Sequence, residues 1–387
     1  MTRAAIIVLD GVGAGAAPDA ADYGDEGSDT LGNLARAVGG MHLPSLQALG
    51  LGNALRLLGV PPSEAPWAAW GTMRPRSPGK DSTTGHWEIA GIVLERPFPT
   101  YPDGFPADLV DAFARATGRS VIGNVAASGT EIIARLGQES VRRGAWIVYT
   151  SADSVFQIAA HEGAVPLEEL YAACRTARAL LAAPHDVSRV IARPFEGEPG
   201  AYRRTPNRRD FSLEPPAETL LDALASAGIA RRGVGKVDDL FAGRGISAEH
   251  VAGNAEGVAA VRRALDEMDG GLLFANLVDF DQRWGHRNDV PGFYGGLREL
   301  DAALPALLAH LREDDLLFLT ADHGNDPTTP STDHSRERVP LLAIGGAVHP
   351  VSLGERPTFA DLGATVADWL RVEFRGAGRS FLPDLLG

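Results

Sequence analysis

Runs of apolar residues indicate where the strands of a buried sheet lie. Residues 4–9 form a short run rich in Ile and Val, which is typical of a strand buried on both faces of a parallel sheet. Residues 272–278 and 316–320 repeat this pattern, and an acidic residue follows each of the three runs within two positions. Ligands of open α/β sheets bind beyond the carboxyl ends of the strands. We therefore expect these three strand ends to meet at one site.

Helical periodicity appears beside these strands. Leucines at spacings of three and four between 297 and 311 predict an amphipathic helix, which completes a βαβ unit with the strands before and after it. A further apolar run at 339–344 precedes a second helical pattern at 359–370. Both ends of the chain therefore predict one α/β core with a mostly parallel sheet flanked by helices.

Two proline-rich breaks separate the middle of the chain from this core. Four prolines lie between residues 96 and 106, and two more stand at 215–216. The segment between the breaks has its own strand pattern at 146–150 and its own helical pattern at 167–181. We predict a metal-binding catalytic core and an inserted smaller α/β cap domain. The core comprises 1–97 and 215–387, and the cap comprises 98–214.

Composition narrows the class of protein. A net charge of -14 over 387 residues disfavours general binding to nucleic acid or to anionic membranes. The only cysteine, Cys174, permits neither an intrachain disulfide nor a cysteine-based zinc site. The first apolar run is too short for a signal peptide, and no run approaches the length of a membrane span. We expect a cytoplasmic enzyme that needs no obligatory protein partner.

A set of carboxylates and imidazoles at or just after the predicted strand ends indicates a metal centre. Mixed oxygen and nitrogen ligands without thiolates suit Mn²⁺ or Zn²⁺ better than Ca²⁺. Each residue alone could instead cap a helix or pack at the surface. The spacing also leaves Asp279 and Asp281 as alternatives, since both can face one side of a strand. The candidate ligands are Asp10, Asp281, His286, Asp322, His323 and His334.

Hydroxyl side chains cluster in the segment 80–88. Ser82, Thr83 and Thr84 stand before Gly85, and we expect a helix to open at His86. A phosphate there would face unpaired helix amides and the positive end of the helix dipole. A hydroxyl in contact with a metal ion also becomes a competent nucleophile at neutral pH. The alternative is an ordinary Ser/Thr helix cap.

Positive charge gathers in one part of this acidic protein. Residues 189–209 contain six arginines against two glutamates. Guanidinium groups match the geometry of phosphate oxygens, so this segment can receive a phosphate. We select Arg193, Arg204 and the more distant Lys236 as candidate phosphate ligands. A solvated basic face that pairs with acids elsewhere is the alternative for any one arginine.

The motifs of the chain, taken together, resemble phosphopentomutases of the alkaline phosphatase superfamily, and the resemblance covers nearly the whole chain. Ser82 and Thr83 stand at variable positions within it, which favours Thr84. The matching segments are 8–10, 27–32, 80–88, 151–157, 233–237, 279–281, 285–287, 322–326 and His334.

This resemblance implies a specific chemistry. Thr84 would be the phosphorylated nucleophile, and Asp153 would bind sugar hydroxyls. The family pattern favours Asp281 over Asp279 and implies two Mn²⁺ ions, with other divalent metals possible. A sugar bisphosphate such as glucose 1,6-bisphosphate would prime the enzyme. One ion would bind Asp281, His286 and His334, and the other Asp10, Asp322 and His323.

The expected reaction interconverts ribose 1-phosphate and ribose 5-phosphate, and their deoxyribose equivalents, through a pentose 1,5-bisphosphate. A metal-dependent phosphatase or a phosphoglycerate mutase of the same superfamily is an alternative. A dinucleotide-binding module is a more remote one, suggested by the glycines of 11–15, although the expected third glycine spacing is missing. A non-catalytic sugar-phosphate sensor would have no use for a hydroxyl beside a metal.

Overall fold

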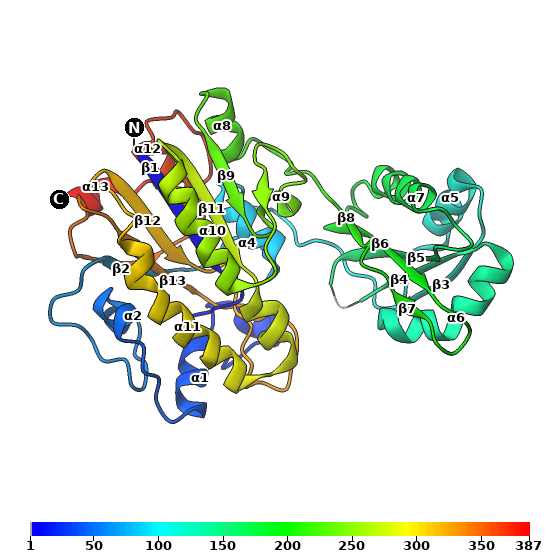
Figure 1. Ribbon diagram of the computed structural model, residues 1–387, viewed down its shortest axis with the longest axis horizontal. Coiled ribbons are helices and arrows are strands. Elements are labelled where there is room, and N and C mark those ends of the chain that lie inside the picture. Colours follow the sequence, from blue (N-terminus) through cyan, green and yellow to red (C-terminus); the bar gives the residue numbers. More distant parts are fainter. Residues whose placement is uncertain (1, 152) are drawn as a thin grey trace. The chain divides into compact units, whose positions relative to one another are not determined.

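The computed structural model describes residues 2–151 and 153–387, shown in Figure 1. The chain divides into two compact units. The larger unit comprises Met1–Pro97 and Pro215–Gly387, and the smaller unit comprises Phe98–Glu214. Each unit contains its own sheet, so each is described by itself.

The larger unit is built on a sheet whose central strand is β1 (Arg3–Leu9), which is buried along its whole length. Five neighbouring strands run parallel, whereas β13 pairs antiparallel with both of its neighbours. The expected α/β fold with a mostly parallel sheet is therefore confirmed. In spatial order the strands are β10 (Ala248–Glu249), β9 (Arg231–Val234), β11 (Gly271–Leu277), β1, β12 (Asp315–Thr320), β13 (Val339–Ile344), β2 (Ala69–Met73) and β14 (Ser352–Arg356).

Helices cover both faces of this sheet (Figure 1). In that view α10 and α11 lie in front of the sheet, and α4 and α12 lie behind it. The helices of the larger unit are α1 (Thr30–Ala37), α2 (Pro44–Ala48), α3 (Leu51–Ala54), α4 (Ser82–Ile89), α8 (Leu220–Ser226), α9 (Val237–Leu240), α10 (Asn254–Glu267), α11 (Val290–Leu308), α12 (Ala360–Trp369) and α13 (Leu382–Leu386), with the short turns η1 (Ala20–Tyr23), η2 (Phe280–Trp284) and η3 (Gly285–Arg287).

Two of these helices begin earlier than the sequence pattern predicts. The leucine pattern begins at Leu297, but α11 begins at Val290, because the Asp289 carboxylate accepts the Gly292 amide at 2.9 Å and caps the helix. The expectation that α4 opens at His86 is wrong for the same reason. Asp81 caps this helix, which starts at Ser82. The hydroxyl residues therefore lie within the first turn of α4.

The smaller unit has a mixed sheet with helices packed against it. Its apolar core includes Trp146 and Phe156, which are fully buried. The strands pair in the order β3–β4–β5–β6–β7, and β8 pairs antiparallel with β6. The elements are α5 (Ala107–Thr117), β3 (Val121–Ala126), α6 (Gly129–Arg143), β4 (Trp146–Thr150), β5 (Val155–His161), α7 (Leu167–Leu180), β6 (Arg189–Glu196), β7 (Arg203–Arg204) and β8 (Arg209–Ser212).

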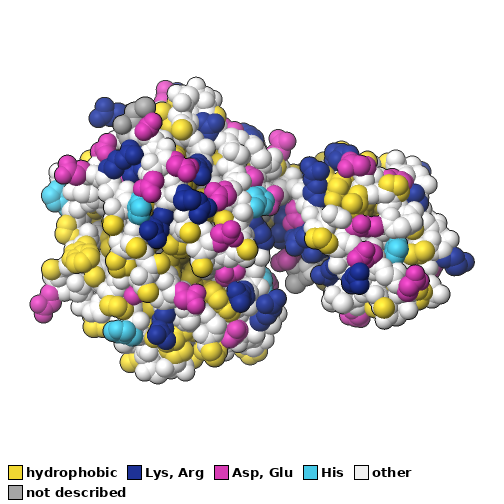
Figure 2. All heavy atoms as spheres, in the orientation of Figure 1, with side chains coloured by type: hydrophobic (Ala, Val, Ile, Leu, Met, Phe, Trp, Pro, Cys, Tyr) yellow, Lys and Arg dark blue, Asp and Glu magenta, His cyan; other side chains and the backbone are white. Residues whose placement is uncertain are grey.

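On the face of the molecule drawn in Figure 2, acidic and basic side chains are interspersed over each unit. Among the described residues, no helix is both long and apolar enough to cross a membrane.

Candidate functional site

Three parallel strands deliver carboxylates to one edge of the larger sheet. Asp10 follows β1 directly, and Asp322 stands two residues beyond β12. Asp281 lies in the first turn of η2, just after β11. Because β1 lies between β11 and β12 with parallel register on both sides, these strand ends meet. All three carboxylates are buried.

Two histidines join Asp281 in a first cluster. Its carboxylate oxygens lie 3.2 Å from His334 Nε2 and 3.2 Å from His286 Nε2. One potential ligand atom from each of these three residues lies within 4.8 Å of the others. This is the set that the family resemblance implies for one of the two ions. Asp279, the sequence-based alternative to Asp281, instead accepts the amide of Asn254 at 2.8 Å.

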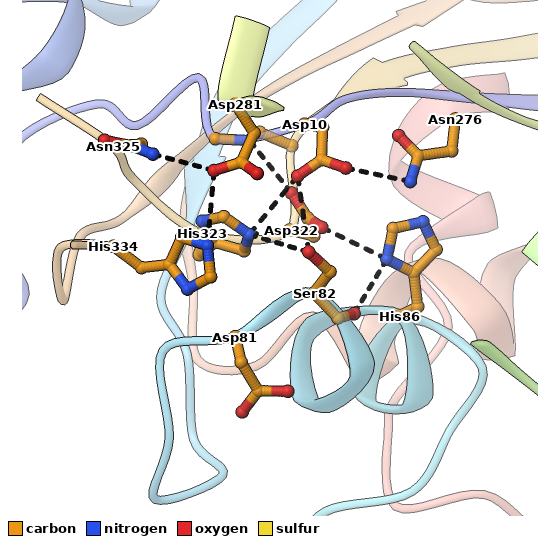
Figure 3. Close-up of polar contacts among 12 residues, drawn as sticks. Asp10, Asp81, Ser82, His86, Asn276, Asp281, Asp322, His323, Asn325 and His334 are labelled. Atoms are coloured by element: carbon orange, nitrogen blue, oxygen red, sulfur yellow. Dashed lines mark hydrogen bonds and ion pairs between the residues drawn. The ribbon is translucent and has the colours of Figure 1, made fainter. Parts of the chain in front are cut away.

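A second cluster adjoins the first. His323 Nε2 lies 3.3 Å from Asp10 Oδ1 and 3.6 Å from Asp322 Oδ2. Ligand atoms of Asp10, Asp281 and His323 come within 4.8 Å of one another. Asp281 thus belongs to both clusters, while Asp322 stands at the side of the second. The six side chains that the sequence indicated are all brought together, and Figure 3 labels each of them except His286.

Hydrogen bonds to the backbone orient two of the histidines as metal ligands. His286 Nδ1 lies 2.7 Å from the Thr332 carbonyl, and His323 Nδ1 lies 3.0 Å from the Gly324 carbonyl. Since a carbonyl only accepts, each Nδ1 carries the hydrogen in these bonds. A neutral ring in this tautomer presents a bare Nε2 toward the carboxylates, which is the arrangement of ligating histidines.

Unsatisfied polar atoms also fit a bound cation. Asp322 Oδ2 and His334 Nε2 are buried and make no hydrogen bond. Leaving such atoms unpaired costs about 1 to 3 kcal/mol each, and more for a charged group. Divalent cations bound at the two clusters would satisfy these atoms and would neutralise the three neighbouring carboxylates. The residues present therefore fit a metal centre.

The electrostatics of the cluster show how closely the charges are packed. Burial, together with repulsion from the Asp322 and Asp281 carboxylates, raises the pKa of Asp10. Burial would also raise the pKa of Asp281, but attraction to His334 and then the hydrogen bond of His286 outweigh it and hold that pKa well below its ordinary value. The cluster thus keeps Asp281 ionised at neutral pH.

Helix α4 brings a hydroxyl to the two clusters. The Asp81 carboxylate accepts the Thr84 amide at 3.0 Å and the Thr84 hydroxyl at 2.6 Å. The hydroxyl of the sequence-based candidate Thr84 is thus bonded within its own turn, and the residue is only 3% exposed. In contrast, Ser82 Oγ lies 3.1 Å from His323 Nε2 and 3.4 Å from Asp10 Oδ1. Figure 3 shows Ser82 pointing toward the clusters and Asp81 pointing away from them.

Three uncharged or imidazole side chains around the carboxylates escaped the sequence analysis. Asn276 donates to Asp10 at 3.0 Å, and Asn325 donates to Asp281 at 2.7 Å. His86 Nδ1 lies 3.1 Å from Asp322 Oδ2. One signal was available for Asn276, because it is the only polar residue within the buried strand β11.

The predicted substrate ligands lie in both units. In the larger unit, Lys236 directly precedes α9 and donates to Gln282 at 2.9 Å, and Gln282 is next to Asp281 in sequence. In the smaller unit, Asp153 stands half-buried between β4 and β5. Arg193 lies on β6 and Arg204 on β7.

The arginines of the smaller unit surround a buried tyrosine. A Cβ atom on Gly129 would clash with both the Arg204 guanidinium and the Tyr149 hydroxyl, so these groups converge at the first residue of α6. Arg193 donates to Gln157 at 3.0 Å. Burial, followed by the positive charge of Arg208, lowers the pKa of Arg193 to about 10. An anion placed here would relieve this repulsion.

Comparison with known proteins establishes the family. A model of the metalloenzyme superfamily matches residues 2–374. A phosphopentomutase from Desulfitobacterium hafniense is 57% identical over 389 residues, covering 100% of both chains. The chain belongs to the phosphopentomutase family. The recognition from sequence motifs, and with it the assignment to the isomerases, is confirmed, which decides against a dinucleotide-binding module.

Other relatives agree with this membership. A phosphopentomutase from Anaeromyxobacter dehalogenans is 58% identical over 385 residues, covering 99% of each chain. Among solved structures, a Pyrococcus horikoshii protein has a TM-score of 0.51 at 16% identity, covering 97% of this chain and 99% of its own. A Leishmania mexicana phosphoglycerate mutase has a TM-score of 0.50 at 13% identity, with coverages of 98% and 97%. These two structures support the fold.

Proposed function

We propose that this phosphopentomutase family member interconverts ribose 1-phosphate and ribose 5-phosphate, and the deoxyribose equivalents, through a phosphorylated hydroxyl of α4. The proposal rests chiefly on the position of Ser82 Oγ, beside His323 and Asp10 at the start of that helix. A phosphoryl group there would face the free amides of the first turn and the candidate metal ligands together.

Two divalent cations, Mn²⁺ by resemblance to the family, complete this proposed site. Asp281, His286 and His334 would hold one ion, and Asp10, Asp322 and His323 the other. Bound ions would neutralise charge on the transferring phosphoryl group and favour the ionised form of a neighbouring hydroxyl. The clustered ligand atoms and the two backbone-oriented imidazoles support this assignment.

The geometry favours Ser82 over Thr84 as the phosphoryl acceptor. Ser82 is the first residue of α4 and half-buried, so its hydroxyl can be reached by a substrate. Thr84 is the third residue, and its hydroxyl is held by Asp81. Side chains two positions apart on an α-helix point about 200° apart, so the two hydroxyls cannot face the same ligands. The sequence-based choice of Thr84 remains a prediction, and we propose Ser82 in its place.

The reaction cycle follows from a phosphorylated Ser82. Its phosphorus–Oγ bond breaks as a new bond forms to O5 of ribose 1-phosphate, which gives ribose 1,5-bisphosphate. The bisphosphate then presents its C1 phosphate. The bond from phosphorus to O1 breaks, the phosphoryl group returns to Oγ, and ribose 5-phosphate leaves. A sugar bisphosphate such as glucose 1,6-bisphosphate would first load the hydroxyl.

Substrate binding is assigned to residues of both units. We propose that the unit formed by 98–214 is a cap domain and that the unit formed by 1–97 and 215–387 is the catalytic core. Arg193 and Arg204 would bind the phosphate that is not being transferred, and Asp153 would bind sugar hydroxyls. Lys236, in the larger unit, is the third candidate ligand of this phosphate. The converging guanidinium groups near Gly129 support the phosphate assignment.

The identity of the phosphoryl acceptor is tested by mapping the covalently bound phosphate to a residue. The purified protein is exposed to glucose 1,6-bisphosphate, and the modified peptide is sequenced by mass spectrometry. We expect one added phosphoryl group, on Ser82. Ser82→Ala should abolish labelling and lower turnover by about 1,000-fold or more, as for loss of other catalytic nucleophiles. Thr83→Ala and Thr84→Ala serve as matched neighbours and should still be labelled. Phosphate on Thr84, with labelling intact in Ser82→Ala, would refute the choice of Ser82.

Product analysis tests the reaction class. Ribose 1-phosphate incubated with the primed, Mn²⁺-loaded protein should yield ribose 5-phosphate without free phosphate. Stoichiometric release of phosphate and no isomer would instead indicate a phosphatase of the same superfamily.

A further inference from the structure

His86 lies on α4, on the side that faces the loop 321–326, here called the metal loop because it carries Asp322 and His323, and the proposed mechanism gives His86 no role. Its side chain is fully buried, and its ring stacks on Phe274 of β11 with centroids 5.6 Å apart. Nδ1 lies 2.9 Å from the carbonyl oxygen of Ser82 and 3.1 Å from Asp322 Oδ2 (Figure 3). One nitrogen thus contacts both the residue that carries the reactive hydroxyl and a candidate metal ligand.

Both partners of this nitrogen are hydrogen-bond acceptors. A backbone carbonyl cannot donate, and the Asp322 carboxylate already accepts the amide of Gly11 at 3.2 Å. The Nδ1 atom of His86 must therefore carry a hydrogen, which it donates to the Ser82 carbonyl while the Asp322 Oδ2 atom lies in contact 3.1 Å away. Its Nε2 atom is buried without a hydrogen-bond partner. The useful donor of this side chain is thus at the δ position alone.

The backbone at the same point is equally close. A Cβ atom on Gly85 would clash with the carbonyl oxygen of Asp322, so α4 approaches the metal loop as nearly as glycine permits. The stacked Phe274 restricts the other side of the His86 ring. His86 therefore has little freedom, and any shift of its Nδ1 atom would alter the positions of Asp322 and of the first turn of α4 together.

We propose that His86 is a positioning residue. Through Nδ1 and its hydrogen, it would hold the Asp322 carboxylate and the first turn of α4, which carries Ser82, in a fixed position relative to each other. It contacts neither substrate nor transferred phosphate. This inference rests on the proposed function, since it requires that the cluster binds metal and that Ser82 reacts. Groups that orient metal ligands in this way typically change metal affinity by about 10- to 100-fold when they are lost.

Two amide substitutions separate the hydrogen bond from packing. Asn places its NH₂ group near the position of Nδ1, whereas Gln places it near Nε2. His86→Asn and His86→Gln both remove the ring that stacks on Phe274, so each is the packing control for the other. Mn²⁺ affinity is measured by titration calorimetry on metal-free protein, and melting of the metal-free proteins shows whether each variant folds.

We expect His86→Gln to bind Mn²⁺ about 10- to 100-fold more weakly than the natural protein, and His86→Asn to recover most of that loss. The visible absorption spectrum of the Co²⁺-loaded protein should change in His86→Gln and be largely retained in His86→Asn, because the geometry of Asp322 sets the ligand field. Equal losses in both variants, or no loss in either, would overturn the role of Nδ1.

The same titration separates this inference from the proposed function. If the natural protein binds no divalent metal, the metal centre itself fails. If it binds metal and is phosphorylated on Ser82, but His86→Gln has unchanged affinity and spectrum, only the role of His86 fails. Should either variant melt in the metal-free form at the assay temperature, His86→Ser with added imidazole replaces it. If imidazole restores the Mn²⁺ affinity of His86→Ser, the proposal is supported, and if it does not, the proposal is contradicted.

Discussion

The two units concentrate opposite charges, and each does so by a different structural device. In the larger unit, parallel strands end in carboxylates that meet at one edge of the sheet, with imidazoles turned toward them. In the smaller unit, guanidinium groups from β6 and β7 gather around a buried tyrosine and the start of α6. The first arrangement suits a cation, and the second suits an anion.

The contrast between the acidic and the basic region shows how one acidic chain can offer local sites suited to a phosphorylated substrate. The net charge of -14 repels phosphates over most of the surface. Burial and then repulsion among carboxylates raise the pKa of Asp10, and burial and then repulsion among arginines lower the pKa of Arg193. Each region therefore has a local excess of one charge. A bound ligand of the opposite charge would reduce the repulsion within that region.

The largest expected effect comes from the acidic region. Asp281→Asn removes the carboxylate shared by both clusters, and should lower turnover by roughly 1,000-fold, since metal ions supply several kcal/mol of transition-state stabilisation. Steady-state kinetics and Mn²⁺ calorimetry measure this. Asp279→Asn is the matched control, because Asp279 binds the Asn254 amide instead. Equal losses in both variants would mean that the cluster geometry does not define the metal centre.

A smaller effect is expected in the basic region. Arg193→Ala should lower kcat/KM for ribose 1-phosphate by roughly 10- to 100-fold, because a hydrogen bond to a charged group contributes about 1.5 to 3 kcal/mol. Mn²⁺ affinity should stay unchanged, which keeps the two regions functionally distinct. Arg203→Ala is the control, since its side chain is 75% exposed and pairs with Glu196 at 3.0 Å. Weakened Mn²⁺ binding in Arg193→Ala would contradict the expectation that the basic region acts independently of the metal centre.

The smallest effect concerns the acid that balances these arginines. Burial would raise the pKa of Asp210, but the hydrogen bond from Arg208 and the charges of Arg208, Arg189 and Arg193 outweigh it and lower that pKa. Asp210 therefore stabilises the folded smaller unit above its ordinary pKa of 3.8, and this contribution is lost as the pH falls through the lower folded value.

Asp210→Asn should accordingly destabilise the smaller unit by about 1 to 3 kcal/mol at pH 7, and the difference from the natural protein should shrink below pH 3.8. Hydrogen exchange of peptides from β6 and β8, followed over a pH series and corrected for intrinsic rates, measures this. Glu139→Gln is the control, because its exposed pair with Arg143 contributes only about 0.5 kcal/mol. A difference that grows on acidification would contradict the sign.

Much of the fold could be predicted because its strands are buried on both faces. Such strands appear as uninterrupted apolar runs, and β1, β12 and β13 lie within a residue of the predicted bounds. The first residues of the helices were harder to predict, because α4 and α11 are each capped by a single aspartate in a polar segment. The candidate metal ligands could be named from their places after strands, but Asn276 and His86 act through contacts with residues far away in sequence.

The sequence by itself determined the chemistry that is possible here: carboxylates and imidazoles after parallel strands, and hydroxyls before Gly85. Only the tertiary structure decided which hydroxyl faces the ligands. The Asp81 cap sets the start of α4, and the helical rotation of about 100° per residue then directs Ser82 and Thr84 to different surroundings. A motif records the order of residues, whereas the direction of a side chain depends on where its helix begins and what that helix packs against.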